Sequence, residues 1–561
     1  MKKFFLPLIV LSSSAIAQQL GPNVSGNVET TFQYLNEDTL IGANQPAEKA
    51  VLNNYALINY TQKGFKAGVR FESYLPHLLG YPDRFSGSGI GYRYAGYSTD
   101  QLDFTVGNFY EQFGNGMIFR AYEQRQLGLD NAMDGLNVRF RPVPGVEFKA
   151  VYGKMRRTFT DGLINADGIV RGFDGSIDFA TFYDLLAESN FKFVIGGSFV
   201  SKYQKVTNPL YYMPQNVGSY GGRVEMKYLV RDNDSSGIKR NGSFFLNAEY
   251  VIKENDPSSD NNYIFNNGHA AFVNLGYTQK GLGIILYAKS IDNMSYRVDP
   301  NAKLTDLNIN FLPALTKSHT ENLAATLYPY ATQPQGEVAF QADVFYKIKK
   351  GTKIGGKYGT EINVNFATSY RPVRHTSGIN TADSTGVTYQ TTLFDKSDSL
   401  YYRDFNIEIK RTLSKSWKAS VKYFHFDFNN NANVVTKDAH GMIRCHILAT
   451  EIQYKITKKH SLRLEVQGLW TKEDKGNWAT VLLEYNISPK FYFAVLDQYN
   501  YGNPVESRRV HYLIGTAGYI FGSSRIAILY GKQREGIFCI GGVCRAVPAT
   551  NGLTVTFTTS F

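Results

Sequence analysis

Five charged side chains of both signs lie close together between positions 120 and 134. In a channel, a ring of fixed charges can form a constriction that discriminates between ions, which is one function for these residues. Three glycines, Gly114, Gly116 and Gly128, allow the backbone around them to turn sharply. The same charges could instead form an ion-paired structural loop that seals a barrel, and the sequence leaves both interpretations open. The five candidates for a lumen constriction are Arg120, Glu123, Arg125, Asp130 and Asp134.

The sequence carries no familiar catalytic pattern. It contains no His-Glu-x-x-His, Gly-x-Ser-x-Gly or phosphate-loop motif. His425 and Asp427 lie two residues apart on one face of an expected strand and could be half of a protease or acyl-transfer site. A pair flanked by aromatic residues near a strand end is more often an interfacial cluster, so we expect no enzyme activity. The glycines of 87–91 fall in an expected loop, which gives no support for a dinucleotide site, and no cofactor is expected.

Only three cysteines occur, which excludes a disulfide-rich scaffold. Cys539 and Cys544 are separated by Ile-Gly-Gly-Val, and the two glycines let the chain turn back so that the thiols could pair after export. A metal site there would need two more ligands, and none is evident nearby. Cys445 is expected to be a small apolar packing residue.

The first seventeen residues have the features of a signal peptide. Lys2 and Lys3 precede an apolar run over 4–11, and the small-residue site Ala15-Ile16-Ala17 predicts cleavage before Gln18. No cysteine stands at that site, which argues against a lipoprotein anchor. We therefore expect residues 18–561 to form one exported domain that reaches a membrane through its own fold.

Strict alternation of apolar and polar residues runs along nearly the whole chain and predicts strands with two different faces. An antiparallel sheet in a soluble protein also alternates, but it covers its apolar face with a second layer, and no helical pattern here supplies one. In 461–470 the apolar face carries Leu462, Leu464, Val466 and Trp470, whereas the polar face carries Arg463, Glu465 and Gln467.

The connections between these strands alternate between short turns and long, variable, polar segments such as 292–336 and 371–400. This asymmetry is typical of outer-membrane barrels, which have short periplasmic turns and long extracellular loops. In hydrocarbon, each backbone N–H or C=O group without a hydrogen bond costs several kcal/mol. The sheet must therefore close so that no strand edge is left unpaired. We predict an all-β, antiparallel transmembrane barrel of about 24 strands (range 22–26) with a lumen partly plugged by loops. The short turns are 61–64, 98–101, 142–145, 279–281, 413–416, 487–490 and 522–524.

The composition excludes two other classes of protein. The chain has 39 Tyr and 38 Phe and only 19% charged residues, which excludes disorder. Outside the leader no stretch approaches the roughly 18 apolar residues that a membrane-spanning helix needs. The last segment, 552–561, alternates and ends at Phe561, so it resembles the terminal strand that the barrel-assembly machinery recognises.

One longer stretch resembles a known family. Residues 106–125 read Val-Gly-Asn-Phe-Tyr-Glu-Gln-Phe-Gly-Asn-Gly-Met-Ile-Phe-Arg-Ala-Tyr-Glu-Gln-Arg, and Leu127-Gly-Leu-Asp-Asn-Ala-Met-Asp-Gly135 follows. Together with 74–81 and the final Cys-x-x-Gly-Val-Cys segment, this is similar to an uncharacterised-domain family of Bacteroidota outer-membrane proteins. The resemblance implies an outer-membrane barrel and brings no reaction, ligand or catalytic residue.

The net charge of +12 could suggest nucleic acid as a partner, but no helix or aromatic platform gathers the charge, and nucleic-acid binding is not expected. Outer-membrane lipid is the expected partner of the apolar face. The leading hypothesis is a channel or porin-like barrel with loops inside its lumen, for which we single out 292–336 and the loop after Tyr110. The alternative is an accessory subunit of an export or assembly complex, in which aromatic loops such as 208–214 bind another envelope protein.

Overall fold

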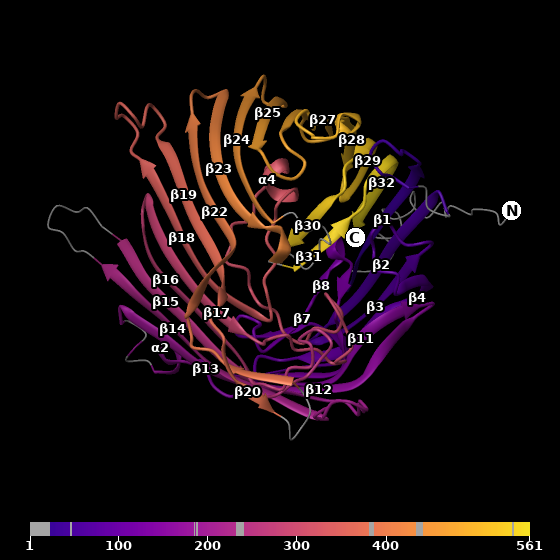
Figure 1. Ribbon diagram of the computed structural model, residues 1–561, viewed down its shortest axis with the longest axis vertical. Coiled ribbons are helices and arrows are strands. Elements are labelled where there is room, and N and C mark those ends of the chain that lie inside the picture. The colour runs from indigo at the N-terminus through magenta and orange to yellow at the C-terminus, as the bar shows by residue number, and fades with distance from the viewer. Residues whose placement is uncertain are drawn as a thin grey trace.

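The computed structural model describes residues 23–44, 48–183, 186, 189–231, 241–380, 386–432, 441–540 and 543–561. The expected leader, its cleavage site and Gly541-Gly542 lie outside these residues. In the described part of the chain, 24 strands form one antiparallel sheet that closes when β1 pairs with β32 (Figure 1). The barrel strands are β1 (Val24–Asn36), β2 (Ala50–Gln62), β3 (Phe65–Tyr74), β4 (Phe85–Ser98), β5 (Leu102–Phe109), β10 (Met133–Phe140), β11 (Val146–Thr160), β12 (Leu163–Asp178), β13 (Phe191–Tyr203), β14 (Asn216–Arg231), β15 (Asn241–Lys253), β16 (Gly268–Gln279), β17 (Leu282–Asp292), β18 (Gly336–Ile348), β19 (Thr360–Pro372), β22 (Lys396–Thr412), β23 (Trp417–Asn429), β24 (Met442–Lys455), β25 (His460–Thr471), β26 (Trp478–Ile487), β27 (Phe491–Tyr499), β28 (His511–Phe521), β29 (Ser524–Gln533) and β32 (Thr550–Ser560).

The strands follow chain order around the wall, so alternate connections lie at the same rim. All seven predicted short turns lie at one rim, and the first and last barrel strands also have their free ends there. We call this the short-turn rim and the opposite one the long-loop rim. The predicted long connection 292–336 matches the gap between β17 and β18. The prediction for 371–400 was too long, because β19 continues to Pro372 and β22 already begins at Lys396.

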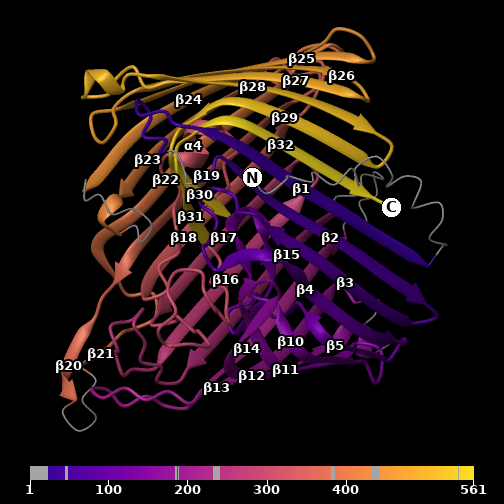
Figure 2. The ribbon, with the colours of Figure 1, turned by 90° about the vertical axis from the view of Figure 1, so that its right-hand side faces the viewer.

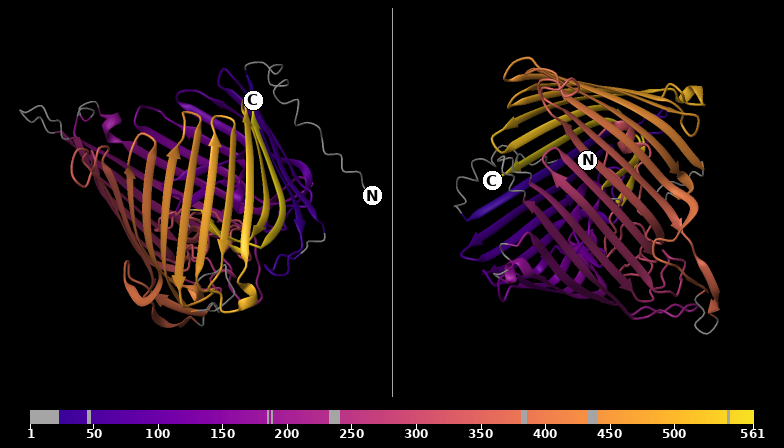
Figure 3. Two further views of the ribbon diagram at one scale, coloured as in Figure 1. Left: turned by 90° about the horizontal axis from the view of Figure 1, so that it is seen from above. Right: turned by 90° about the vertical axis from the view of Figure 1, so that its left-hand side faces the viewer.

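The two faces of the wall differ as the alternation predicts. On β25 the side chain of Val466 is 46% exposed on the outer face, whereas its neighbour Gln467 is 2% exposed on the inner face. The same contrast separates outward Phe405 from inward Asp404 on β22. The apolar side chains of the outer face are therefore exposed, with no second layer over them in the described part of the chain, and the oblique strands run around the wall (Figures 2 and 3).

Several short elements are not part of the wall. Figure 1 shows β7, β8, α4 and the β30–β31 hairpin inside the ring of strands. The β20–β21 hairpin extends away from the barrel at the lower left of Figure 2. No helix in the described ranges is long and apolar enough to span a membrane. The short elements are β6 (Glu111–Phe113), β7 (Phe119–Ala121), β8 (Glu123–Gln124), η2 (Arg125–Leu127), β9 (Leu129–Asp130), α2 (Phe179–Phe182), α4 (Asn322–Thr326), β20 (His375–Asn380), β21 (Gly386–Gln390), η3 (Asn430–Ala432), η4 (Glu506–Arg508), β30 (Gly536–Ile540) and β31 (Val543–Val547).

The principal hydrophobic core lies between the wall and these inner segments. Phe113, Phe119 and Ile309 from two different connections pack against inward wall residues that include Val170 and Val251. A barrel that closes on itself, with an apolar exterior and a packed interior, is the architecture of outer-membrane β-barrels. The predicted all-β class and the closed antiparallel barrel of about 24 strands are confirmed.

Candidate functional site

Three of the five predicted constriction residues join an ion-pair network on the inner side of β3 and β11. The β8–β9 hairpin presents Glu123 and Asp130, and η2 presents Arg125. The wall contributes Arg70 and Arg156, which sequence reasoning did not place here. The guanidinium of Arg70 lies 3.1 Å from Glu123 and 2.7 Å from Asp130. Arg156 lies 2.8 Å from Asp130.

The network continues on the wall, where Glu72 and Arg156 are buried. Arg156 also pairs with Glu72 at 2.8 Å, and the hydroxyl of Tyr74 donates to the same carboxylate. Arg125 reaches Glu29 on β1 at 2.8 Å. Burial, followed by the neighbouring Asp130 carboxylate, raises the pKa of Glu123 above its ordinary value. Because these charges are paired with one another, the network is suited to fixing the β8–β9 hairpin to the wall.

The other two predicted residues lie elsewhere. The guanidinium carbon of Arg120 lies 4.2 Å from the ring centroids of both Tyr122 and Phe311, an arrangement stabilised by cation–π attraction. Asp134 is in β10, where Arg93 lies 3.3 Å from its carboxylate and Asn165 donates to it at 2.8 Å. The structure therefore divides the five residues among three environments.

Three buried lysines hold a second inner segment against the wall. They lie on alternate strands, β13, β15 and β17, near the long-loop rim, and each points inward. Each ammonium group donates to a main-chain carbonyl of 295–313, which satisfies a buried acceptor and the buried charge together. The sequence did carry a signal for these lysines, namely an inward lysine near the same end of several alternate strands. This signal was missed. The contacts are Lys202 Nζ to Arg297 O at 2.6 Å, Lys253 Nζ to Ser295 O at 2.7 Å and Lys289 Nζ to Pro313 O at 2.6 Å.

Each lysine also has an acidic partner. Lys289 lies 2.8 Å from Glu337 on β18, and both side chains are completely buried. Lys202 and Lys253 lie 2.6 Å and 3.8 Å from Asp256. Buried ammonium groups are costly unless paired and hydrogen-bonded, so these positions specify where the segment must sit.

The same connection crosses to the opposite wall. His319 Nε2 lies 2.7 Å from Asp404 on β22, and Glu321 pairs with Lys422 on β23. At α4 the backbone N–H of Leu323 donates to Gln467 of β25 at 3.0 Å. Residues from 295 to 323 therefore contact strands from β13 to β25, across the interior seen in Figure 1.

The inner connections also bind one another. The backbone N–H of Arg120 donates to Ile309 at 2.8 Å, and the Asn131 amide donates to Asn308 at 2.8 Å. The amide of Asn310 donates to Met117 at 3.1 Å. The loop after Tyr110 and the 292–336 connection consequently form one body inside the ring.

The β30–β31 hairpin adds a third inner segment. Cys539 and Cys544 face each other with Cα atoms 4.1 Å apart and form a disulfide. The guanidinium of Arg545 donates to Gly80 O at 2.7 Å, and Arg534 contacts Thr326 in α4. Burial lowers the pKa of Arg534 to about 10. The segment 534–547, which contains the hairpin, thus links α4 to the connection between β3 and β4.

The structure places the remaining candidates at the wall. Cys445 is completely buried in a cluster with Phe426 and Leu323, as expected for a packing residue. His425 Nε2 lies 3.5 Å from Asp427 Oδ1, on the opposite face of β23 from Phe426. Within the described residues, no group of three or more potential His, Cys, Asp or Glu ligands could hold a metal ion.

Comparison with known proteins gives a family and distant structural similarity. The model of a family described as "Family of unknown function (DUF6029)" matches residues 1–561. No curated protein matches the sequence. Similar solved structures include the siderophore receptor PirA from Pseudomonas aeruginosa, with 10% identity over 96% of this chain and 80% of that chain and a TM-score of 0.43. The outer membrane protein opdK from Pseudomonas aeruginosa has 8% identity over 83% and 98% of the two chains and a TM-score of 0.36, and OccAB4 from Acinetobacter baumannii has 9% identity over 96% and 98% with a TM-score of 0.34.

Proposed function

Because the chain belongs to a family of unknown function (DUF6029), we propose from its own contacts that it is an outer-membrane channel closed at rest by its long connections. The apolar outer face supports insertion in a bilayer, since lipid is the environment in which such a surface needs no second protein layer. The resemblance noted in the sequence, rather than the fold, supports a Bacteroidota source, and the leader supports export with cleavage after Ala17.

The closed state is supported chiefly by the three inward lysines. A barrel of 24 strands is wider than porins of roughly 16–18 strands, so an empty lumen would be a large aqueous hole. Lys202, Lys253 and Lys289 each hold the 292–336 connection to the wall through a main-chain carbonyl. Moving this connection would leave three ammonium groups without those acceptors, and the docked position is therefore strongly favoured.

All the inner segments enter from the long-loop rim. In outer-membrane barrels this rim faces the outside of the cell. A solute that displaced the inner segments would consequently act from outside, and the strands themselves need not move. We propose no enzymatic reaction and no cofactor for this arrangement.

Planar-bilayer conductance tests the proposal. The wild-type protein should show no steady pore, whereas a chain with 295–333 replaced by a short glycine–serine linker should show large, steady conductance. The linker is compatible with the fold because Asp292 and Gly336 pair directly across β17 and β18. Shortening the exposed 208–212 loop instead is the control and should leave the protein silent. Equal conductance of the wild type and the 295–333 replacement would contradict plugging.

A second candidate function is that of an accessory subunit. Leu210 and Tyr212 are exposed on the connection between β13 and β14, and the ring of Tyr211 stacks on Tyr263 at 4.6 Å. Exposed aromatic residues on an ordered loop suit a protein interface. Purification in mild detergent separates the two functions: a stable envelope complex lost in the 208–212 variant would favour the accessory role.

Assembly of the barrel is proposed to use the last strand. β32 pairs with both β1 and β29, and Phe561 O accepts a hydrogen bond from Gly26 N at 2.9 Å. The terminal residue therefore lies at the seam that closes the sheet, where recognition by the barrel-assembly machinery would precede closure.

A further inference from the structure

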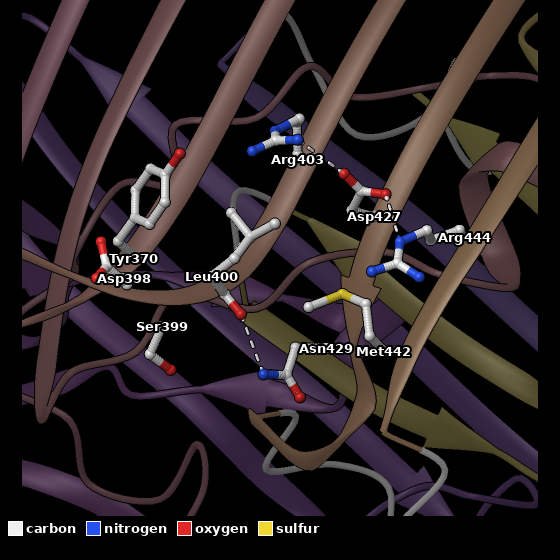
Figure 4. Close-up of a pocket in the computed structure, with 9 residues that line it drawn as sticks. All are labelled: Tyr370, Asp398, Ser399, Leu400, Arg403, Asp427, Asn429, Met442 and Arg444. Carbon is white, nitrogen blue, oxygen red and sulfur yellow. Dashed lines mark hydrogen bonds and ion pairs between the residues drawn. The ribbon is translucent and has the colours of Figure 1, made fainter.

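An open pocket of about 510 Å³ lies where β19, β22, β23 and β24 approach the long-loop rim (Figure 4). Three of its charged side chains come from neighbouring strands: Arg403 from β22, Asp427 from β23 and Arg444 from β24. Tyr370, Leu400 and Met442 line the rest of the pocket.

The charged side chains point away from the lumen. Each follows or precedes a residue that is buried in the inner cluster with α4, namely Tyr402, Phe426 and Cys445. Successive side chains on a strand point to opposite faces, so Arg403, Asp427 and Arg444 lie on the outer face. The pocket is therefore separate from the segments inside the barrel.

One buried carboxylate hydrogen-bonds to one guanidinium group and forms a longer ion pair with the other. Asp427, with a side chain only 7% exposed, lies 3.1 Å from Arg403 Nη1 and 3.7 Å from Arg444 Nε. The Arg444 side chain is 66% exposed and lines the pocket, so it is accessible to a ligand there. Two neighbouring guanidinium groups with solvent-exposed side chains are suited to phosphate, which they can bind through parallel charge-assisted hydrogen bonds.

The overall charge of the pocket also favours an anion. Asp398 contributes a second carboxylate to the lining, and Lys396 Nζ lies 4.3 Å from the centroid of the Tyr370 ring. Together with the two arginines and Asp427, the pocket region carries three cations against two carboxylates.

The surface next to the pocket indicates which kind of anion fits. Further along the same strands, toward the short-turn rim, the outer face turns apolar at Phe405 and Leu448, and Trp470 is exposed on the neighbouring strand β25. Tryptophan at the edge of an apolar band marks the level of lipid headgroups in membrane barrels. The cations thus lie at headgroup level. Phe405 follows Arg403 directly on the outer face, whereas the His425–His446 ring pair lies between Arg444 and Leu448.

We propose that this pocket binds the phosphate group of an anionic lipid in the outer leaflet. The phosphate of the lipid lies against Arg403 and Arg444, and the acyl chains of the same lipid run along Phe405 and Leu448. The inference rests on the proposed membrane location, with the long-loop rim outside, but it does not require the lumen to conduct. A soluble phosphate would use only the cations and gain nothing from the apolar strip.

Lipid binding to the full-length protein in mild detergent tests this assignment. Native mass spectrometry would compare diphosphoryl lipid A with its dephosphorylated form. The wild type should prefer the phosphorylated lipid, and the R403A/R444A double variant should bind it about tenfold or more weakly, because two charge-assisted contacts are lost. The single variant R444Q, altered at an exposed side chain, should show a smaller loss in the same direction.

Arg171→Ala is the matched control. Arg171 is an exposed arginine on β12 that donates to Ser201 at 2.9 Å, far around the wall from the pocket, and its loss should change lipid affinity by no more than about twofold. Retained heat-modifiable migration in gels establishes that each variant is folded. Unchanged lipid A affinity in folded R403A/R444A, or equal affinity of the wild type for both lipids, would overturn the proposal. Displacement of bound lipid A by millimolar inorganic phosphate would also overturn it, because the site would then take a soluble anion. None of these readouts depends on conductance, so the pocket and the channel can fail separately.

Discussion

Lys289→Met should release the 292–336 connection from the wall. The substitution keeps most of the side-chain volume but removes a buried ammonium group that contacts the buried Glu337 at 2.8 Å and the partly buried Pro313 O at 2.6 Å. Breaking a buried ion pair by removing one partner costs roughly 3–5 kcal/mol. The wall strands can keep their pairing while the connection moves, so we expect this cost to shift the docking equilibrium rather than to unfold the barrel.

The magnitude makes the effect measurable. At about 1.4 kcal/mol per factor of ten, roughly 3–5 kcal/mol corresponds to a gain of about two to three and a half orders of magnitude in the undocked population. Planar-bilayer recordings should therefore show opening events in Lys289→Met that are rare or absent in the wild type. Heat-modifiable migration provides the check that the barrel itself is folded.

Lys347→Met is the matched control, because Lys347 also pairs with a glutamate, Glu361, at 2.7 Å, but in an exposed position at the short-turn rim. Exposed pairs contribute only about 0–1 kcal/mol, so this variant should record like the wild type. Adding Glu337→Gln to Lys289→Met should restore part of the closed state, since the unpaired carboxylate is removed. If a folded Lys289→Met protein showed as few opening events as the wild type, the role given to the buried lysines would be refuted.

Two further predictions concern the other inner contacts. Although burial raises the pKa of Glu321, Lys422 lowers it below the ordinary 4.5, so this contact stabilises docking above about pH 4.5 and loses that contribution as the pH falls through the lowered pKa. Channel openings of the wild type should therefore become more frequent in acid. The Glu321→Gln variant should already open at neutral pH, and its openings should depend less on pH. Identical pH profiles of the two proteins would contradict this. Arg156→Met leaves Glu72 and Asp130 short of a partner and should lower the free energy of unfolding by roughly 3 kcal/mol or more, measured as a lower urea midpoint of the detergent-solubilised protein. An unchanged midpoint would show that the network does not hold the barrel together.

The strand pattern was sufficient to predict the wall. Alternation has a period of two, so a residue such as Val466 could be assigned to the outer face and Gln467 to the inner face without knowing any partner strand. The short turns fixed the strand count, because each joins neighbours at the same rim. The segment 371–400 was misjudged because its ends continue the ladder of β19 and β22, and polar strand ends look like loops in a sequence.

The inner contacts were less accessible to sequence reasoning. The charges at 120–134 were recognised as a cluster. Their partners Arg70 and Arg156, which pair with Asp130, lie outside it on the wall strands β3 and β11. Whether two charges meet inside a barrel depends on strand register and on the path of a connection through the lumen, and neither is encoded by spacing alone. Asp134 illustrates this point, because β10 begins at Met133 and places Asp134 on the wall.

Neighbouring residues on one wall strand are expected to face lipid and an enclosed interior, respectively. Leu483 and Glu484 on β26 test it most directly, since Leu483 is exposed on the outer face and Glu484 pairs inward with Arg463 at 2.8 Å. Nitroxide labels on Leu483→Cys and Glu484→Cys in bilayers should differ in accessibility. Oxygen, which concentrates in lipid, should relax the label at position 483 more strongly than the label at position 484. A water-soluble nickel chelate should relax the label at position 484 more strongly. Equal accessibility of the two labels to both reagents would contradict the account.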